Sequence, residues 1–477
     1  MKTENLKEIL EQVRGKVTPS PRERKRVEGL AEKLRKRLEA ELSRRRLPGE
    51  VRLEGSIAKD TWLSGDADID LFVLVPEKVP RKRFHDDYLK AFRKVLEGYR
   101  VVGRFAEHPY LEAWVTSKLR VNIVPCYKVK PPNWKSATDR TPYHTEYVKA
   151  RLSAESRSEV RLLKRFMKGV AVYGSDIKTG GFSGYLTELL ILAYGSFLEV
   201  LREASRWRPG VLIDLEGFYE GRREEAEKLF EEHCLMVVDP VDKTRNVASP
   251  LRREVFDLFR AAARRFLDKP DLRFFYPPAV RRPPPEKLKR LLKARGTNLV
   301  FVKFGRVKAV PDILWGQLYK TERALKNLME IHGFQVLRSK VWSDEEKASI
   351  IVFELEQARI GRVKKHLGPP LTSSQEARFL VKHLKAEETV AGPYLEDGRW
   401  AVLTCRKYFD VRRLLLEQLA RGGREVGVAS RIADSIKAYG FQVKVDTEIL
   451  SFYRRKRDFQ AFLAEFLSGK PFWLSLE

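Results

Sequence analysis

Two aspartates at the start of an apolar segment are the first residues whose spacing could do chemistry. The stretch "EGSIAKDTWLSGDADIDLFVLVP" (54–76) places Asp68 and Asp70 at the mouth of a predicted strand, with Phe72 and Leu74 next on the same face. Side chains two apart on a strand share a face, so the two aspartates form a carboxylate pair. Such a pair loses hydration and repels itself at the edge of a core unless a cation joins it. Because Mg²⁺ combines a few carboxylate oxygens with substrate phosphate oxygens, the pattern predicts a site for this cation and a triphosphate.

The residues just before the pair resemble a phosphate-binding turn. Gly55 permits a close approach of the backbone to a ligand, and Ser56 lies at a strand-to-helix turn where N–H groups and a hydroxyl can hold phosphate. Lys59 is near enough to offset charge. Each feature alone is weak, because an isolated Asp-x-Asp is more often the end of a surface strand. Together they favour metal-dependent nucleotidyl transfer, which a third carboxylate on a neighbouring strand would complete as a two-metal site.

Composition points to a polyanionic partner. The chain has 477 residues, with 93 Lys and Arg against 65 Asp and Glu, a net charge of +28. A heavily charged thermophile surface explains the charged fraction but not its sign, so we expect RNA or DNA as the partner. Cys126, Cys234 and Cys405 have neither zinc nor disulfide spacing. With no apolar run of about 18 residues and no signal-peptide pattern, we expect a cytoplasmic protein with no membrane partner.

The elements around the pair predict a small α/β head. Apolar residues at three- and four-residue steps predict one helix over 19–46. A strand "EVRLEGS", a helical turn, the strand "ADIDLFVLVP", a helix over 83–98 and three further strands follow, the last two as a hairpin around Ser117-Lys118. This order predicts a small mixed sheet with helices.

The rest of the chain reads as a helical region followed by an α+β region. Helices are predicted over 159–169, 185–201 and 251–267, and "HCLMVVDPVDKTRNVAS" reads as a strand and a structured loop. The proline-rich "FFYPPAVRRPPPEKLKR" is the clearest domain boundary. Beyond it a β-α-β-β order, with a helix over about 314–333, predicts an α+β sandwich. A strand in "RWAVLTCRKYF", the helix "VRRLLLEQLA" and a helical C-terminus complete the chain.

Seven sequence blocks together resemble one family. They are "GSIAKDTWLSGDADIDLFVLVP", "AEHPYLE", "VNIVPCYKV", "KSATDRTPYH", "VRLLKRFMK", "GFSGYLTELLILAYGSFLE" and "DPVDKTRNVAS". In this order they resemble the archaeal (class I) CCA-adding enzymes, the tRNA nucleotidyltransferases of the DNA polymerase beta-like nucleotidyltransferase superfamily, with eukaryotic poly(A) polymerase as a relative. The resemblance runs from about residue 22 to the C-terminus and thins after residue 283.

The resemblance implies template-independent addition of C, C and A to the 3′ end of tRNA from CTP and ATP with Mg²⁺. It implies an α/β and α+β multidomain fold: a nucleotidyltransferase catalytic head at 1–138, a central (neck) domain completing the nucleotide pocket at 139–270, an α+β body at 271–365 and a mixed or helical tail contacting tRNA at 366–477. The implied partners are the tRNA acceptor arm and 3′ end, and a homodimer is compatible with it. The family's catalytic metal ligands fall on Asp68 and Asp70, and its nucleotide contacts fall on Gly55, Ser56, Lys59, Thr141, His144, Lys164, Tyr173 and the base-reading Arg245.

One catalytic position departs from the family pattern. The third carboxylate, the Asp of a "VDVVP"-like strand, is Asn122 in this chain's "VNIVP". An amide oxygen can bind a metal as a catalytic ligand, but it carries no charge and is a poor base. Either the sequence was altered to block turnover, or Asn122 suffices, or another acid such as Glu112 substitutes. We expect nucleotide binding to survive with reduced turnover.

Alternatives to both the function and the residue roles remain open. The alternatives to CCA addition are an ATP-specific, poly(A)-polymerase-like enzyme and a catalytically disabled RNA-binding protein. Several of the implied residues also have a purely structural interpretation: an N-cap for Thr141, a structural histidine for His144, a solvated helix residue for Lys164, a core aromatic for Tyr173, and an ion pair with Asp239 or Asp242 for Arg245.

Overall fold

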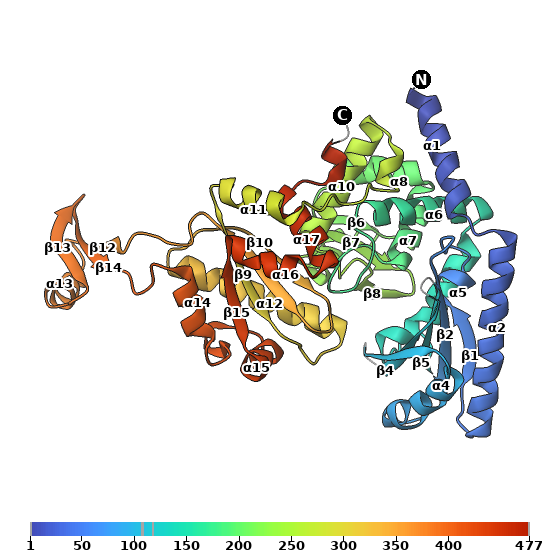
Figure 1. Cartoon of the computed structure of the whole chain (residues 1–477). Coiled ribbons are helices and arrows are strands. Elements are labelled where there is room, and N and C mark those ends of the chain that lie inside the picture. The colour runs from blue at the N-terminus through green and yellow to red at the C-terminus, as the bar shows by residue number, and fades with distance from the viewer. Residues whose placement is uncertain (1, 106–108, 117–118, 476–477) are drawn as a thin grey trace. The chain divides into compact units, whose positions relative to one another are not determined.

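The computed structural model describes residues 2–105, 109–116 and 119–475. The chain divides into two compact units (Figure 1), one formed by Met1–Pro278 with Pro471–Glu477 and the other by Ala279–Lys470. The turn expected at Ser117-Lys118 and the first three residues of the "AEHPYLE" block lie outside the described residues.

The N-terminal part of the first unit is a five-stranded sheet covered by helices. Its elements are α2 (Pro21–Arg44), β1 (Glu50–Glu54), α3 (Gly55–Ala58), β2 (Ala67–Pro76), a π-helical turn (Phe84–Tyr88), α4 (Leu89–Val95), β3 (Arg100–Phe105), β4 (Pro109–Thr116) and β5 (Leu119–Lys128). The strand order is β1-β2-β5-β4-β3, with β2 and β5 parallel and the other neighbours antiparallel. The predicted small mixed sheet with helices is confirmed.

Burial explains why these elements form as predicted. Ser20 caps α2 by accepting a hydrogen bond from the Glu23 N–H, and the apolar stripe of the helix is buried. In β2 the side chains of Ile69, Leu71 and Val73 are fully buried on one face. The opposite face carries Asp68 and Asp70 and then a small apolar cluster of Phe72, Leu74, Val124 and Cys126. The carboxylates therefore lie where one face of the strand enters the core.

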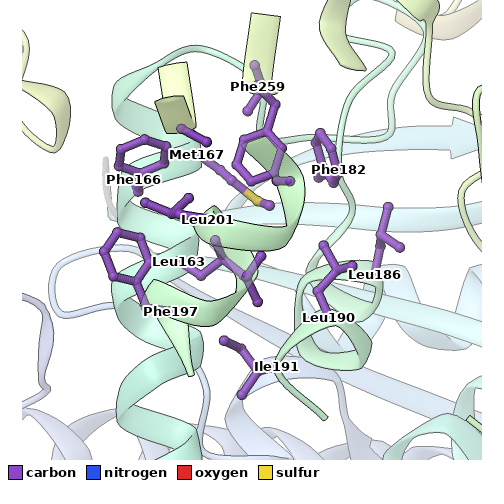
Figure 2. Close-up of a cluster of buried hydrophobic side chains, with 14 of the residues drawn as sticks. Leu163, Phe166, Met167, Phe182, Leu186, Leu190, Ile191, Phe197, Leu201 and Phe259 are labelled. Atoms are coloured by element: carbon purple, nitrogen blue, oxygen red, sulfur yellow. The ribbon is translucent and has the colours of Figure 1, made fainter. Parts of the chain in front are cut away.

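The remainder of the first unit is mostly helical. Its elements are α1 (Lys2–Val17), α5 (Thr141–Arg151), α6 (Ala154–Gly169), α7 (Gly184–Tyr194), α8 (Phe197–Arg206), β6 (Val211–Ile213), α9 (Arg223–Leu229), β7 (Leu235–Asp239), β8 (Asp242–Asn246) and α10 (Arg253–Asp268), with 3-10 turns at Ala137–Arg140, Leu272–Phe274 and Phe472–Ser475. Figure 2 shows its core, where side chains from α6, α7, α8 and α10 and from the segment before α7 converge: Leu163, Phe166, Met167, Phe182, Leu186, Leu190, Ile191, Phe197, Leu201 and Phe259.

Two predicted elements of this region are wrong. The single helix expected over 185–201 is two helices, α7 and α8, bent by 92°. Gly195, with a φ of +84°, ends α7, and the Ser196 hydroxyl caps α8 by accepting from the Glu199 N–H. The structured loop expected after Asp239 is instead a second strand, β8, antiparallel to β7.

Within the described residues no single helix is long and apolar enough to cross a membrane, and the bent pair α7 and α8 meets that criterion only when taken together.

The second unit is an α+β sandwich with an additional small sheet. Its elements are α11 (Pro285–Ala294), β9 (Asn298–Phe304), α12 (Pro311–Ile331), β10 (Val336–Ser343), β11 (Ser349–Leu355), β12 (Val363–Pro370), α13 (Glu376–Leu384), β13 (Thr389–Glu396), β14 (Arg399–Cys405), α14 (Val411–Leu419), α15 (Ser430–Tyr439), β15 (Phe441–Val445), α16 (Leu450–Tyr453) and α17 (Arg457–Ser468), with 3-10 turns at Arg424–Val426 and Asp446–Ile449. The main sheet has the order β10-β11-β9-β15, and a separate sheet has the order β12-β14-β13.

Alternating side chains of the main sheet fill two separate cores. Val300 and Val302 of β9 pack in a core with α12, α14 and α15, whereas Leu299 and Phe301 pack in a core with α11, α16 and α17. The predicted β-α-β-β order and α+β sandwich are confirmed. Strands β12 and β13 were not predicted, because each contains a Gly-Pro that interrupts a strand pattern and most of their residues are exposed or half-buried.

Candidate active site

Gly55 is required by the carboxylate beside it. The residue has a φ of +70° at the turn between β1 and α3, and a Cβ built on it would lie 2.1 Å from Asp70 Oδ2. The sequence interpretation assigned this glycine to the approach of a ligand. The structure shows that the group approaching it is the side chain of Asp70, so any larger residue would displace that carboxylate.

The sheet register brings the three predicted catalytic residues together. In the parallel pairing of β2 and β5, Asp68 lies opposite Arg120 and Asp70 opposite Asn122. Arg120 donates to both Asp68 oxygens, from Nε at 2.8 Å and Nη2 at 2.7 Å. Asn122 Nδ2 donates to Asp70 Oδ1 at 2.8 Å. This pairing leaves two carboxylates and one amide on adjoining strands, with one guanidinium beside them.

The electrostatics of these residues suit a divalent cation. Burial, together with the neighbouring charge of Asp68, raises the pKa of Asp70 to about 7 against the lowering effect of Asn122 and Lys59. Asn122 Oδ1 is buried and has no hydrogen-bond partner among the described residues. Carboxylate oxygens have further lone pairs beyond those used by Arg120, so Asp68, Asp70 and the Asn122 amide oxygen form a donor set that fits a hard cation.

Glu112 lies directly opposite Asn122 in the antiparallel pairing of β4 and β5. It is buried, and its Oε1 accepts a hydrogen bond from Arg104 Nη2 at 2.9 Å. Its substitution for the missing third carboxylate stays a prediction.

A buried lysine cluster lies between the Gly-Ser turn and the helices of the central region. Lys59 Nζ donates to Glu188 Oε2 at 2.5 Å, and Lys164 Nζ donates to Glu188 Oε1 at 3.2 Å. Lys164 also donates to the hydroxyl of Thr61 at 3.0 Å, which in turn donates to Glu188 Oε1 at 2.5 Å. Lys164 is therefore not the solvated helix residue of the structural interpretation.

Tyr173 adjoins this lysine cluster. Burial raises the pKa of its hydroxyl, and the charges of Glu188, Asp68 and Asp70 act in the same direction. A Cβ added to Gly184 would lie 3.0 Å from the Tyr173 hydroxyl and 3.7 Å from Lys164 Nζ. The Tyr173 hydroxyl and the Lys164 ammonium therefore both lie near Gly184, while the tyrosine ring packs, partly buried, against the core.

Asp239 gathers a second set of predicted nucleotide contacts. Its Oδ2 lies 2.9 Å from His144 Nε2 and accepts from Arg245 Nη1 at 2.7 Å, and its Oδ1 accepts from the Tyr185 hydroxyl at 3.1 Å. The His144 ring stacks on the Tyr185 ring with centroids 4.0 Å apart. Burial lowers the pKa of His144 despite Asp239, so the imidazole is neutral near neutral pH.

These contacts decide two alternatives left open by the sequence. Arg245 pairs with Asp239, while Asp242 accepts from Arg140 Nε at 2.7 Å. Thr141 is the first residue of α5, and Arg140 rather than Thr141 occupies the N-cap position, so the expected capping role is wrong.

Sequence reasoning missed three residues of this region: Arg120, Tyr185 and Glu188. Arg120 precedes Asn122 by two positions and therefore shares its strand face, a signal that was available. Glu188 is a lone carboxylate in the apolar run "YLTELLILAY", and a charge in such a run must be paired.

Comparison with known proteins agrees with this geometry. The family model described as "Nucleotidyltransferase domain" matches residues 32–144, "tRNA nucleotidyltransferase, second domain" matches 158–276, and "CCA-adding enzyme, C-terminal domain" matches 295–446. The fold and the carboxylate pair thus define a multidomain nucleotidyltransferase.

Curated relatives specify the family. The CCA-adding enzyme of Methanosarcina mazei is 36% identical over 419 residues, covering 87% of this chain and 88% of the relative. That of Methanopyrus kandleri is 40% identical over 381 residues, covering 76% and 77%, and that of Methanothermobacter thermautotrophicus is 34% identical over 470 residues, covering 97% of each. The chain belongs to the archaeal class I CCA-adding enzymes and is a tRNA nucleotidyltransferase.

Proposed function

We propose that CCA addition by this chain takes place at Asp68, Asp70 and Asn122, which would hold Mg²⁺. The observation that supports this is the pairing of two carboxylates with an unpartnered buried amide oxygen on adjoining parallel strands. When bound, the cation would supply Lewis-acid stabilisation of the attacking hydroxyl and of the departing pyrophosphate. The carboxylates of Asp68 and Asp70 would supply the negative charge that attracts the cation, and the two hydrogen bonds from Arg120 would keep Asp68 oriented.

The triphosphate of CTP or ATP would be bound by Gly55, Ser56, Lys59, Lys164 and Tyr173. The turn at Gly55 and Ser56 adjoins Asp70, and the two lysines and the tyrosine form the polar group around Glu188. These groups would orient the nucleotide so that the tRNA 3′-hydroxyl attacks its α-phosphorus in line with pyrophosphate. Such positioning supplies much of the rate enhancement in reactions of this kind.

The base would be recognised by His144 and Arg245, with Thr141 nearby at the start of α5. Because its Nε2–H donates to Asp239, a neutral His144 would offer Nδ1 as an acceptor to the base, and Asp239 also orients the Arg245 guanidinium, which donates. Directed hydrogen bonds of this kind distinguish cytosine from adenine more strongly than apolar contact does.

Recognition of tRNA would depend on phosphate contacts with the basic regions of the chain. The net charge of +28 supports this, and contacts to the acceptor arm would release counterions. In a gel shift with tRNA, affinity should fall steeply with salt; a flat response would exclude phosphate-dominated binding.

The reaction is tested with labelled CTP and ATP, Mg²⁺ and tRNA lacking its CCA end. We expect incorporation of both nucleotides. Incorporation of ATP alone would favour the poly(A)-polymerase-like alternative. Tight tRNA binding without incorporation, even by an Asn122→Asp variant, would favour the disabled RNA-binding alternative.

Three broader properties also stay proposals. They are the four-region division at 1–138, 139–270, 271–365 and 366–477, a homodimer, and a cytoplasmic location, which the reduced cysteines Cys126, Cys234 and Cys405 support. Light scattering on the purified chain would determine its oligomeric state.

A further inference from the structure

Glu188 is the member of the lysine cluster whose charge is wrong for direct contact with a phosphate. An ionised carboxylate accepts hydrogen bonds but donates none, and it repels a triphosphate. The side chain is nevertheless fully buried on α7, with an exposed fraction of 0%. Its position therefore requires an explanation other than contact with the triphosphate.

The carboxylate connects two elements that would otherwise carry isolated buried cations. Lys59 follows α3 and Lys164 lies on α6, and their exposed fractions are 6% and 2%. Both donate to Glu188, one to each oxygen. A lysine side chain is long and flexible, so a fixed acceptor determines where each ammonium points.

The charge of the cluster is not balanced. Two ammonium groups share the carboxylate of Glu188, so this carboxylate alone does not neutralise both of them. Burial lowers the pKa of Lys164 to about 8 although Glu188 acts to raise it, and Lys59 and Arg161 add to the lowering. A surplus of this kind is stabilised by an anion, and the Tyr173 hydroxyl lies near Gly184, as the Lys164 ammonium does.

We propose that Glu188 is a positioning residue for nucleotide binding, whose carboxylate holds Lys59 and Lys164 in the orientation that contacts the triphosphate. This inference rests on the proposed phosphate-binding role of the two lysines. Glu188 acts through them and not on the substrate. Loss of Glu188 should therefore weaken binding of the phosphates and leave binding of the nucleoside and of tRNA unchanged.

The inference is tested by binding CTP and CMP, with Mg²⁺, to the full chain and its variants. Glu188→Gln keeps the size of the side chain but turns an NH₂ group toward one of the ammonium donors. Losing a hydrogen bond to a charged group corresponds to about tenfold or more, so CTP affinity should fall by at least that factor. Affinities for CMP and tRNA should stay unchanged, and Glu188→Asp, which keeps the charge, should recover part of the loss.

A matched control separates positioning from folding. Glu159 is also buried, but it pairs with Arg14 and accepts from the Phe197 N–H outside the lysine cluster. Glu159→Gln should lower the thermal midpoint without changing the ratio of CTP to CMP affinity. Loss of CTP and CMP binding by the same factor in Glu188→Gln, or wild-type CTP binding, would overturn the inference.

A Lys164→Met variant separates this inference from the proposed function. If Lys164→Met binds CTP as well as the wild type, the phosphate-binding role itself fails. If Lys164→Met weakens CTP but Glu188→Gln does not, only the positioning role fails. In the double variant, Glu188→Gln should cost less CTP affinity than in the wild type, because one of the groups it acts through is gone. Equal costs would contradict action through Lys164.

Discussion

The acidic cluster at β2 and β5 and the lysine cluster around Glu188 both hold like charges close together, negative in the first and positive in the second. In the first, Asp68 accepts from the guanidinium of Arg120, whereas Asp70 accepts from the uncharged amide of Asn122. In the second, two ammonium groups share the carboxylate of Glu188. Each cluster gathers like charges in a partly or fully buried place and neutralises them incompletely, although unpaired buried charge is costly.

The contrast teaches how to recognise where charged ligands belong. A negative surplus suits a cation, and a positive surplus suits an anion. The two clusters also influence each other, since Lys59 acts to lower the pKa of Asp70 and the aspartates act to raise that of Tyr173. A metal ion would therefore neutralise the acidic cluster and a triphosphate the lysine cluster, and both are ligands that the family's reaction uses.

The largest effect on turnover is expected from removing a charge of the acidic cluster. Asp68→Asn and Asp70→Asn should each lower turnover by about a thousandfold or more, because stabilisation by a bound metal is worth several kcal/mol. Single-turnover CTP incorporation measures this. Asp66→Asn is the control, because Asp66 lies just before β2 and pairs with Lys168; a similar loss there would contradict the assignment.

Although Asp70→Asn should lower turnover, it should raise the stability of the fold. The pKa of Asp70 is raised from 3.8 to about 7, so the unfolded chain loses this proton first and ionisation destabilises the fold as pH rises. In the protein without divalent cation, Asp70→Asn should raise the thermal midpoint, by an amount that grows from about pH 4 to pH 7 and then levels. A constant difference across this range would show that the carboxyl is not perturbed.

Adding a third charge to the acidic cluster should have the reverse effect and raise turnover. Asn122→Asp places a carboxylate opposite Asp70 and increases the negative surplus, so divalent-cation affinity should rise, with turnover rising by about tenfold or more. Calorimetric titration with Mg²⁺ and CTP incorporation measure the two effects. Equal rates in the variant and this chain would remove Asn122 from any critical role.

A smaller effect is expected at Asp239, whose charge is already balanced by Arg245. Asp239→Asn removes the acceptor that orients His144 and Arg245, and the ratio of CTP to ATP incorporation should change by about tenfold. Asp242→Asn, which instead releases Arg140, is the matched control. An unchanged ratio in Asp239→Asn would show that these residues do not read the base.

The smallest effect is a pH dependence of nucleotide affinity. Lys164 has a pKa of about 8 under the combined influence of burial, Glu188, Lys59 and Arg161, so it loses its proton as pH rises through that value. The Michaelis constant for CTP should therefore rise several-fold between about pH 7 and pH 9. Lys164→Arg, which stays charged, should abolish this rise; its persistence would assign the titration to another group.

The amino-acid sequence alone determined much of the fold and the position of the acidic pair. The period of two in "ADIDLFVLVP" predicted that Asp68 and Asp70 share a face, and the strand bounds agree. The three- and four-residue apolar period of α2 was equally informative. Both signals are local, because backbone geometry alone fixes which side chains share a face. The bend at Gly195 was missed because apolar residues continue across it, although Gly-Ser marks the end of one helix and the start of the next.

The tertiary structure decided which distant residues meet. Nothing local to β2 or β5 shows that Asp70 lies opposite Asn122 and Asp68 opposite Arg120, because that register depends on packing of the whole sheet. Likewise Glu188 of α7 meets Lys59, the residue after α3, from 129 residues away, which only the tertiary structure can arrange. Sequence fixes the charges and their faces; packing brings opposite or like charges together and so sets where a cation and an anion are needed.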